Sequence, residues 1–83
     1  MKGKMIRLGL ILPCYNEEEV LPDSFARLSD FFDELTAERR ISRDSFMLFV
    51  NDGSRDATWQ LIQARAKEDS RVRGVSLAGN VGS

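Results

Sequence analysis

Short apolar runs alternate along this chain with longer stretches in which apolar residues recur every three or four positions. Ile6 to Leu12 and Phe46 to Val50 are nearly continuous apolar runs, a pattern typical of strands covered on both faces by helices. Val72 to Leu77 is expected to form a third strand, followed by a truncated loop over Ala78 to Ser83. The pattern therefore predicts three strands of a parallel sheet.

The stretch between the first two runs predicts a helix near residues 22 to 38, because its apolar positions share one helical face. Those positions are Leu21, Phe25, Leu28, Phe32 and Leu35. Pro22 is tolerated in the first turn, where its missing N–H is not needed, and the preceding Glu17 to Glu19 suit the helix dipole. We interpret Glu18 and Glu19 as no more than this acidic helix start.

A second helix is expected to be capped by Asp56 or Ser54 and to end near Asp69. Its inward positions are predicted to be Trp59, Ile62 and Ala66, with Leu61 beside them. The order β-α-β-α-β with right-handed crossovers predicts an α/β fold, half of a doubly wound, mainly parallel sheet, with the first strand beside the second and the third outside it. The other half is absent, so residues 1–83 are interpreted as one incomplete domain.

Composition narrows the possible functions. The net charge of −1 gives no broad positive field for nucleic acid, so no nucleic-acid partner is expected. The chain has no histidine, which excludes imidazole acid-base chemistry. Its single cysteine, Cys14, excludes an internal disulfide, fits a cytoplasmic setting and is interpreted as a packing residue. No apolar run is long enough to span a bilayer, and the N-terminus does not resemble a signal peptide.

Polar motifs follow the first two apolar runs. Pro13 to Glu18 comes directly off the first run, and Asn51 to Ser54 comes directly off the second. Because ligands of open parallel sheets bind beyond the carboxyl ends of the strands, we expect these two segments to share one small-molecule pocket. Asn-Asp-Gly-Ser alone is also an ordinary strand-to-helix turn, so the pairing of the motifs carries the hypothesis.

The two motifs, with the Ser54-x-Asp56-x-Thr58 continuation, resemble the start of a family 2 glycosyltransferase. The closest resemblance is to the dolichol-phosphate mannose synthase and bactoprenol glucosyltransferase branch, from residue 6 onward. It implies a Rossmann-like GT-A nucleotide-binding half, a UDP- or GDP-sugar donor and, in the complete enzyme, inverting transfer to a polyprenyl phosphate for cell envelope glycans. It also implies membrane attachment supplied elsewhere, at the cytoplasmic face.

The resemblance places Pro13 and Tyr15 in the base pocket, Glu17 close to the nucleoside and Asp52 facing the base. The chemistry agrees, because a carboxylate accepts hydrogen bonds, as a ring N–H or a ribose hydroxyl pair requires, and tyrosine offers a flat apolar face. Gly53 allows a tight turn beside a ligand. The Ser54 hydroxyl either meets a phosphate oxygen or caps the helix, and we favour the cap.

The chain departs from the family pattern at several positions. Asn51 stands where the first of two acidic residues is usual, and Val81 and Ser83 stand where an aromatic residue and often a histidine are expected. No Asp-x-Asp motif occurs, so the Mg²⁺ or Mn²⁺ ion implied for the complete enzyme is not expected to bind this chain alone. Catalytic groups are likewise expected to lie outside the chain, which is predicted to be inactive alone.

Two alternatives stay open. The chain is either part of that enzyme or a non-catalytic nucleotide-binding or interaction fragment that pairs its open sheet edge with another chain, including a second copy of itself. A generic flavodoxin-type domain is a weaker alternative, because no glycine-rich phosphate loop is present.

Overall fold

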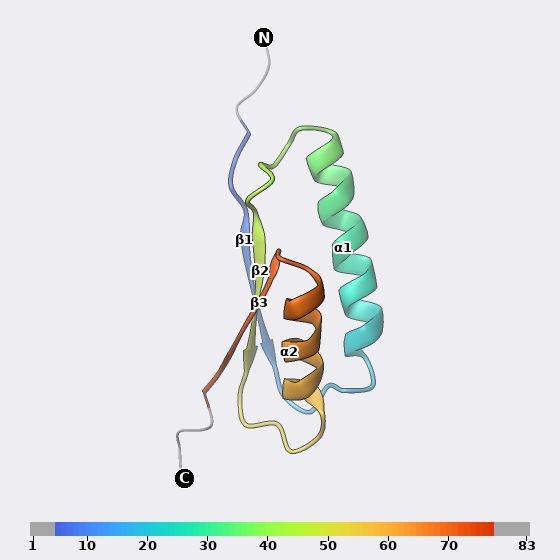
Figure 1. The fold of residues 1–83 in the computed structure, drawn as a ribbon, viewed down its shortest axis with the longest axis vertical. Helices are drawn as coiled ribbons and strands as arrows, with labels where there is room; N and C mark the ends of the chain where they lie inside the picture. The colour runs from blue at the N-terminus through green and yellow to red at the C-terminus, as the bar shows by residue number, and fades with distance from the viewer. Residues whose placement is uncertain (1–4, 78–83) are drawn as a thin grey trace.

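The computed structural model describes residues 5–77, so the predicted loop at 78–83 lies outside the described residues. The element order β-α-β-α-β is confirmed (Figure 1). The elements are β1 (Gly9–Cys14), α1 (Leu21–Ala37), β2 (Phe46–Asn51), α2 (Thr58–Glu68) and β3 (Val72–Ser76). Neither helix within these residues is long and apolar enough to cross a membrane.

The three strands form one parallel sheet in the order β1-β2-β3, as predicted from right-handed crossovers. Gly9 pairs with Phe46 and Cys14 with Asn51, so the carboxyl ends of β1 and β2 are level. The first strand begins at Gly9 rather than at Ile6, because the opposing chain turns just before β2 with the Ser45 N–H bonded to the Ser42 carbonyl at 3.1 Å. Ile6 keeps a single bridge to Ile41.

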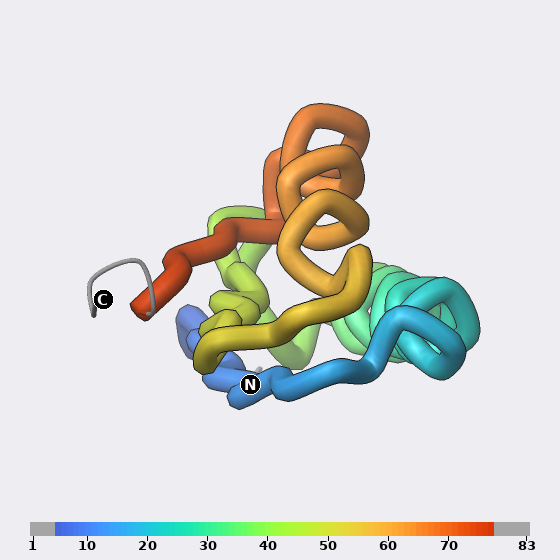
Figure 2. Tube along the Cα trace, turned by 90° about the horizontal axis from the view of Figure 1, so that it is seen from below, coloured from blue at the N-terminus to red at the C-terminus, as the bar shows by residue number. Residues whose placement is uncertain are grey.

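Both helices pack on the same face of the sheet (Figures 1 and 2). The expectation that the first strand is covered on both faces is therefore wrong within the described residues, and Ile11 is 65% exposed. The reason is topological, since two right-handed crossovers that advance in one direction place their helices on one side. Helices would cover the other face only if a crossover connection advanced in the opposite direction along the sheet.

The core lies between the covered face and the helices. Met47 and Phe49 of β2 are buried, and the Phe49 ring meets the Phe25 ring of α1 edge to face, with centroids 5.1 Å apart. Ile62 of α2 is fully buried above Gly74 of β3, where an added Cβ would lie 2.6 Å from Ile62 Cγ2. The predicted inward faces of both helices are confirmed, with the remaining positions partly buried against this cluster.

The helices and strands also meet at the amino end of the sheet, where α2 leads into β3. Arg71 donates two guanidinium bonds to Asp69, at 3.0 and 3.1 Å, and one to Asp33 of α1 at 2.9 Å. The same guanidinium lies over the Phe32 ring, with its Cζ atom 5.9 Å from the ring centroid. This group, which we call the arginine cluster (Asp33, Asp69 and Arg71), ties α1 to the α2–β3 connection.

Candidate functional site

Two loops run alongside each other at the carboxyl ends of β1 and β2 (Figure 2). The first covers residues 15–20 and leads into α1, and the second covers residues 52–57 and leads into α2. The Asp52 N–H donates to the Cys14 carbonyl at 2.9 Å, which extends the ladder one bond beyond the paired strands. This bond brings the start of the second loop next to Tyr15.

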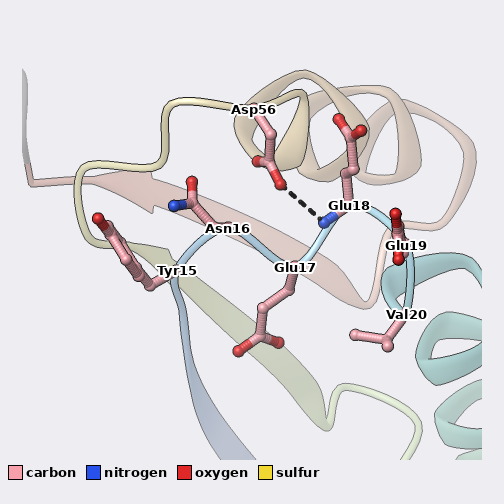
Figure 3. Close-up of a pocket in the computed structure, with 7 residues that line it drawn as sticks. All are labelled: Tyr15, Asn16, Glu17, Glu18, Glu19, Val20 and Asp56. Atoms are coloured by element: carbon pink, nitrogen blue, oxygen red, sulfur yellow. Dashed lines mark hydrogen bonds between the residues drawn. The ribbon is translucent and has the colours of Figure 1, made fainter.

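Three successive backbone N–H groups of the first loop donate to side chains of the second loop and of Thr58, the first residue of α2. The Asn16 N–H reaches Ser54 Oγ at 2.9 Å, and the Glu17 N–H reaches Thr58 Oγ1 at 2.7 Å. The Glu18 N–H reaches Asp56 Oδ2 at 3.2 Å (Figure 3). The acceptors are spaced two residues apart, so the second segment presents alternate side chains to the first.

Bonds also run in the opposite direction. Asn16 Oδ1 accepts the Arg55 N–H at 2.7 Å, and Glu18 Oε1 accepts the Ala57 N–H at 2.7 Å. We call this set of reciprocal bonds the clasp, and its side chains are Asn16, Glu18, Ser54, Asp56 and Thr58.

The turn residues adopt backbone conformations that suit their types. Gly53 has φ of 78° and Asn16 has φ of 51°, in the left-handed region that glycine and asparagine adopt most readily. Asn51 is buried at the end of β2, where its Nδ2 donates to Ser76 Oγ at 3.0 Å and its Oδ1 accepts the Ser54 N–H at 3.3 Å. Asn51 thus joins β2, β3 and the second loop, and its amide supplies both the donor and the acceptor.

An open pocket of about 670 Å³ lies against the first loop (Figure 3). It is lined by Tyr15, Asn16, Glu17, Glu18, Glu19, Val20 and Asp56. Tyr15 is 56% exposed, and the half-buried Glu17 points its carboxylate away from Glu18 and Asp56. Polar side chains therefore surround a hollow with one exposed aromatic ring at its edge.

Comparison with known sequences identifies a protein family that matches this chain. Residues 10–83 match the family described as Glycosyl transferase family 2. The chain belongs to this family. The uncharacterized glycosyltransferase YkoT of Bacillus subtilis is 43% identical over 82 residues, which are 99% of this chain and 24% of that protein.

Two further relatives of this glycosyltransferase chain have names that include a lipid carrier. The prophage bactoprenol glucosyl transferase homolog of Escherichia coli is 34% identical over 93% of this chain and 23% of that protein. The undecaprenyl-phosphate 4-deoxy-4-formamido-L-arabinose transferase of Pseudomonas fluorescens is 36% identical over 90% of this chain and 21% of that protein. The chain spans about a quarter of the length of these curated relatives.

The predicted nucleotide-binding residues of this family 2 chain gather at the two strand ends, but only some line the pocket. Tyr15 and Glu17 form part of its wall. Pro13 lies on β1 opposite Val50 and is exposed. Asp52 is exposed, and the half-buried Gly53 and Ser54 follow it in the second loop, outside the pocket lining.

The structure corrects two helix-start predictions. Neither Ser54 nor Asp56 caps α2, whose N-cap residue is Ala57 and has no side-chain cap bond. The Ser54 hydroxyl instead accepts the Asn16 N–H, and the Asp56 carboxylate accepts the Thr58 N–H at 2.9 Å. Glu18 is more than an acidic start for α1, because its carboxylate binds the Ala57 N–H just before α2. Sequence reasoning missed Asn16, Glu18 and Thr58 as organising residues. The signal was the alternate spacing of Ser54, Asp56 and Thr58 opposite Asn16 and Glu18.

Acidic side chains predominate at this end of the sheet, where Arg55 of the second loop is the basic residue. In the described part of the chain, no ion pair involves Glu17, Glu18, Glu19, Asp52 or Asp56. Burial acts to raise the pKa of Asp56, but bonds from the Thr58 hydroxyl and the Thr58 and Glu18 N–H groups outweigh it and lower that pKa. Burial and the nearby Glu17 raise the pKa of the Cys14 thiol, which suits a packing role.

The described residues do not form a preassembled site for a divalent metal ion. Residues 5–77 contain no group of three or more acidic, cysteine or histidine side chains placed to hold an ion. Glu18 and Asp56, the carboxylates that meet across the loops, already accept backbone N–H groups.

Proposed function

We propose that this chain binds the nucleotide of a UDP- or GDP-sugar in a glycosyltransferase whose acceptor is a polyprenyl phosphate. The observation that carries the proposal is the placement of Tyr15, Glu17 and Asp52 just beyond the level ends of the paired strands β1 and β2, with both carboxylates outside any ion pair of residues 5–77. Membership of Glycosyl transferase family 2 supplies the reaction class. The relatives named for bactoprenol and undecaprenyl phosphate support the lipid acceptor.

Each residue has a role that its chemistry supports. Asp52 accepts a ring N–H of uracil or guanine, and Glu17 accepts hydrogen bonds from ribose hydroxyls. Tyr15 and Pro13 offer apolar surface to the base, and Gly53 lets the backbone approach it. Ser54 keeps a hydroxyl hydrogen that a phosphate oxygen can accept, since in the clasp its oxygen acts as an acceptor.

The pocket lining is acidic, and Arg55 of the second loop lies outside it, so neutralisation of a bound diphosphate is assigned mainly to other groups. A nucleotide diphosphate is itself anionic, and no basic side chain of residues 5–77 lines the pocket. We infer that Mg²⁺ or Mn²⁺, with ligands outside these residues, serves the diphosphate in the complete enzyme. Transfer with inversion, and activity as such, belong to that enzyme, which we place at the cytoplasmic face of the membrane.

An amide-resolved NMR titration with UDP and with GDP, with and without Mn²⁺, tests the proposal. Shifts centred on Tyr15, Glu17 and Asp52, and lost in Asp52→Ala, are the expected result. Asp30→Ala is the matched control, because it removes the same charge from an exposed position on α1. A folded chain whose peaks do not move with either nucleotide would overturn the proposal.

A second candidate is an interaction fragment that pairs with a second copy of itself. It is favoured by the unpaired edge of β1 in the described sheet and by the exposure of Ile11 on the uncovered face. Sedimentation analysis over a range of concentrations separates the two candidates. Dimerisation abolished by Ile11→Lys, without any nucleotide binding, would favour the fragment.

A further inference from the structure

We propose that the clasp is a positioning device that sets the direction of the Glu17 carboxylate toward the nucleotide, with Thr58 as its buried anchor. The inference rests on the proposed nucleotide-binding function and deepens it. The side chains of the clasp share one role, which is to hold the first loop against the second before a ligand binds. These side chains are Asn16, Glu18, Ser54, Asp56 and Thr58.

Thr58 is the central residue of the clasp. Its side chain is 0% exposed, at the first turn of α2, so no ligand can touch it. Its Oγ1 accepts the Glu17 N–H at 2.7 Å and donates its own hydrogen to Asp56 Oδ1. Asp56 in turn accepts the Glu18 N–H, so the hydroxyl lies at the centre of a continuous chain of bonds.

The direction of each side chain in the first loop follows from these bonds. Asn16 and Glu18 turn their side chains to the second loop, where each accepts a backbone N–H. Glu17, between them, points to the other side (Figure 3). Three consecutive N–H groups are fixed by the clasp, so the backbone at Glu17 has little freedom to rotate, and this sets the side of the loop from which its side chain projects.

The benefit is preorganisation. A loop that is already ordered loses less conformational freedom on binding, and this raises affinity without any new ligand contact. The clasp also explains why polar residues recur at alternate positions in the second motif. Ser54, Asp56 and Thr58 face the first loop through their bonds, while Asp52 is left to the ligand.

The test is a double-mutant cycle on nucleotide affinity. Thr58→Val keeps the shape of the side chain and removes the acceptor of the Glu17 N–H, and we expect UDP or GDP affinity to fall roughly tenfold. Thr58→Ser keeps the hydroxyl and is expected to restore most of that affinity. In a Glu17→Ala background, Thr58→Val is expected to cost little more, because Thr58 acts through Glu17.

Matched controls separate positioning from general loss of structure. Thr36→Val makes the same change on the half-buried part of α1, far from the loops, and is expected to leave affinity unchanged. Amide hydrogen exchange should show faster exchange at Glu17 and Glu18 in Thr58→Val, with the core of β2 unaffected. If Thr58→Val fails to fold, Asn16→Gly replaces it in the cycle, because glycine keeps the positive φ and loses only the bond to Arg55.

The outcomes distinguish the two proposals. If the unaltered chain binds neither nucleotide, the proposed function fails and the inference fails with it. If the unaltered chain binds and the losses from Thr58→Val and Glu17→Ala simply add, the positioning role alone is overturned. Non-additive losses with rescue by Thr58→Ser would support both.

Discussion

The two ends of the sheet hold their carboxylates in different ways. At the amino end, the arginine cluster binds Asp69 and Asp33 to a single guanidinium, with bonds of 2.9 to 3.1 Å, and Asp69 also accepts the Arg71 N–H at 3.0 Å. At the carboxyl end, Glu18 and Asp56 are held by backbone N–H groups and a hydroxyl, with no ion pair within residues 5–77. The first arrangement neutralises charge, whereas the second orders the loops and leaves the negative charge in place.

The arrangement at the amino end contributes to the stability of the fold, whereas the arrangement at the carboxyl end leaves groups available for binding a ligand. A carboxylate bound by arginine has its hydrogen-bonding capacity used and its field cancelled, so it has little to offer a ligand. Carboxylates held by N–H groups fix the backbone while their neighbours, Glu17 and Asp52, stay outside any ion pair in the described chain. The comparison predicts that changes at the amino end alter stability alone, and that changes at the carboxyl end alter nucleotide affinity.

The largest expected effect comes from breaking the arginine cluster. Arg71→Met keeps the apolar stem over Phe32 but leaves Asp69, whose side chain is only 16% exposed, without its cation. The free energy of unfolding in urea should fall by about 2 kcal/mol, because a charged hydrogen-bond partner is lost at a partly buried site. Nucleotide affinity of the folded chain should not change.

The matched control for that change is Arg27→Met. Arg27 pairs with Asp23 at 2.9 Å, but both side chains are largely exposed. Exposed pairs contribute less than about 1 kcal/mol, so this variant should melt almost like the unaltered chain. Equal losses from the two variants would show that the arginine cluster has no special importance for stability.

The second effect is on binding. Asp52→Ala should weaken UDP or GDP binding roughly tenfold, equivalent to about 1.4 kcal/mol, because a charged acceptor of a base N–H is removed. Its unfolding free energy should stay nearly constant, since the exposed side chain has no hydrogen bond among the described contacts. Calorimetric titration and urea unfolding, compared with Asp30→Ala, measure the two quantities. A stability loss without an affinity loss would reverse the assignment of this end of the sheet.

The third effect tests whether the turn at the carboxyl end depends on its backbone conformation. Gly53→Ala places a Cβ on a residue with φ of 78° and should lower the free energy of unfolding by about 1 kcal/mol. Gly53→Asn is the matched control, because asparagine adopts this conformation more readily, and its loss should be smaller. Thermal unfolding ranks the three chains, and a chain with alanine that is as stable as the one with glycine would contradict the prediction.

The features that the sequence predicts well are local. The first helix, expected near residues 22 to 38, is found at Leu21–Ala37, because its apolar spacing and Pro22 mark the face and the start. The strand order follows from crossover handedness. Coverage of β1 was predicted wrongly, because a continuous apolar run does not say which face the helices occupy, and Ile11 lies on the uncovered one.

The features that the sequence hides are contacts between distant segments. Asn16 meets Ser54 across 38 positions, and Glu17 meets Thr58 across 41. Local rules assign serine to a helix cap and glutamate to a helix start, and both residues are instead used across the loops. The type of each residue suggested a hydrogen bond at a helix N-terminus, but only the sheet register determined which partner it finds.

The smallest expected effect is the pH dependence of stability that arises from Asp69 at the amino end of the sheet and Asp56 at the carboxyl end. Hydrogen bonds from Arg71 lower the pKa of Asp69 against the opposing effect of burial. Burial likewise acts to raise the pKa of Asp56, but bonds from the Thr58 hydroxyl and from the Thr58 and Glu18 N–H groups lower it, so that both pKa values lie below the ordinary 3.8. The folded chain thus binds fewer protons there than the unfolded chain, and each group contributes stability above pH 3.8 that is lost as the pH falls toward its folded pKa. These two groups should leave the urea concentration at the unfolding midpoint unchanged between pH 7 and pH 5. Below pH 3.8 that midpoint should decrease, and the decrease should be less steep in Asp69→Asn and in Asp56→Asn. Added salt should weaken the contribution of Asp69, which depends partly on an ion pair, more than that of Asp56, which depends on a hydroxyl and N–H groups. An equal response to salt at both positions would mean that the two ends of the sheet hold their carboxylates in the same way.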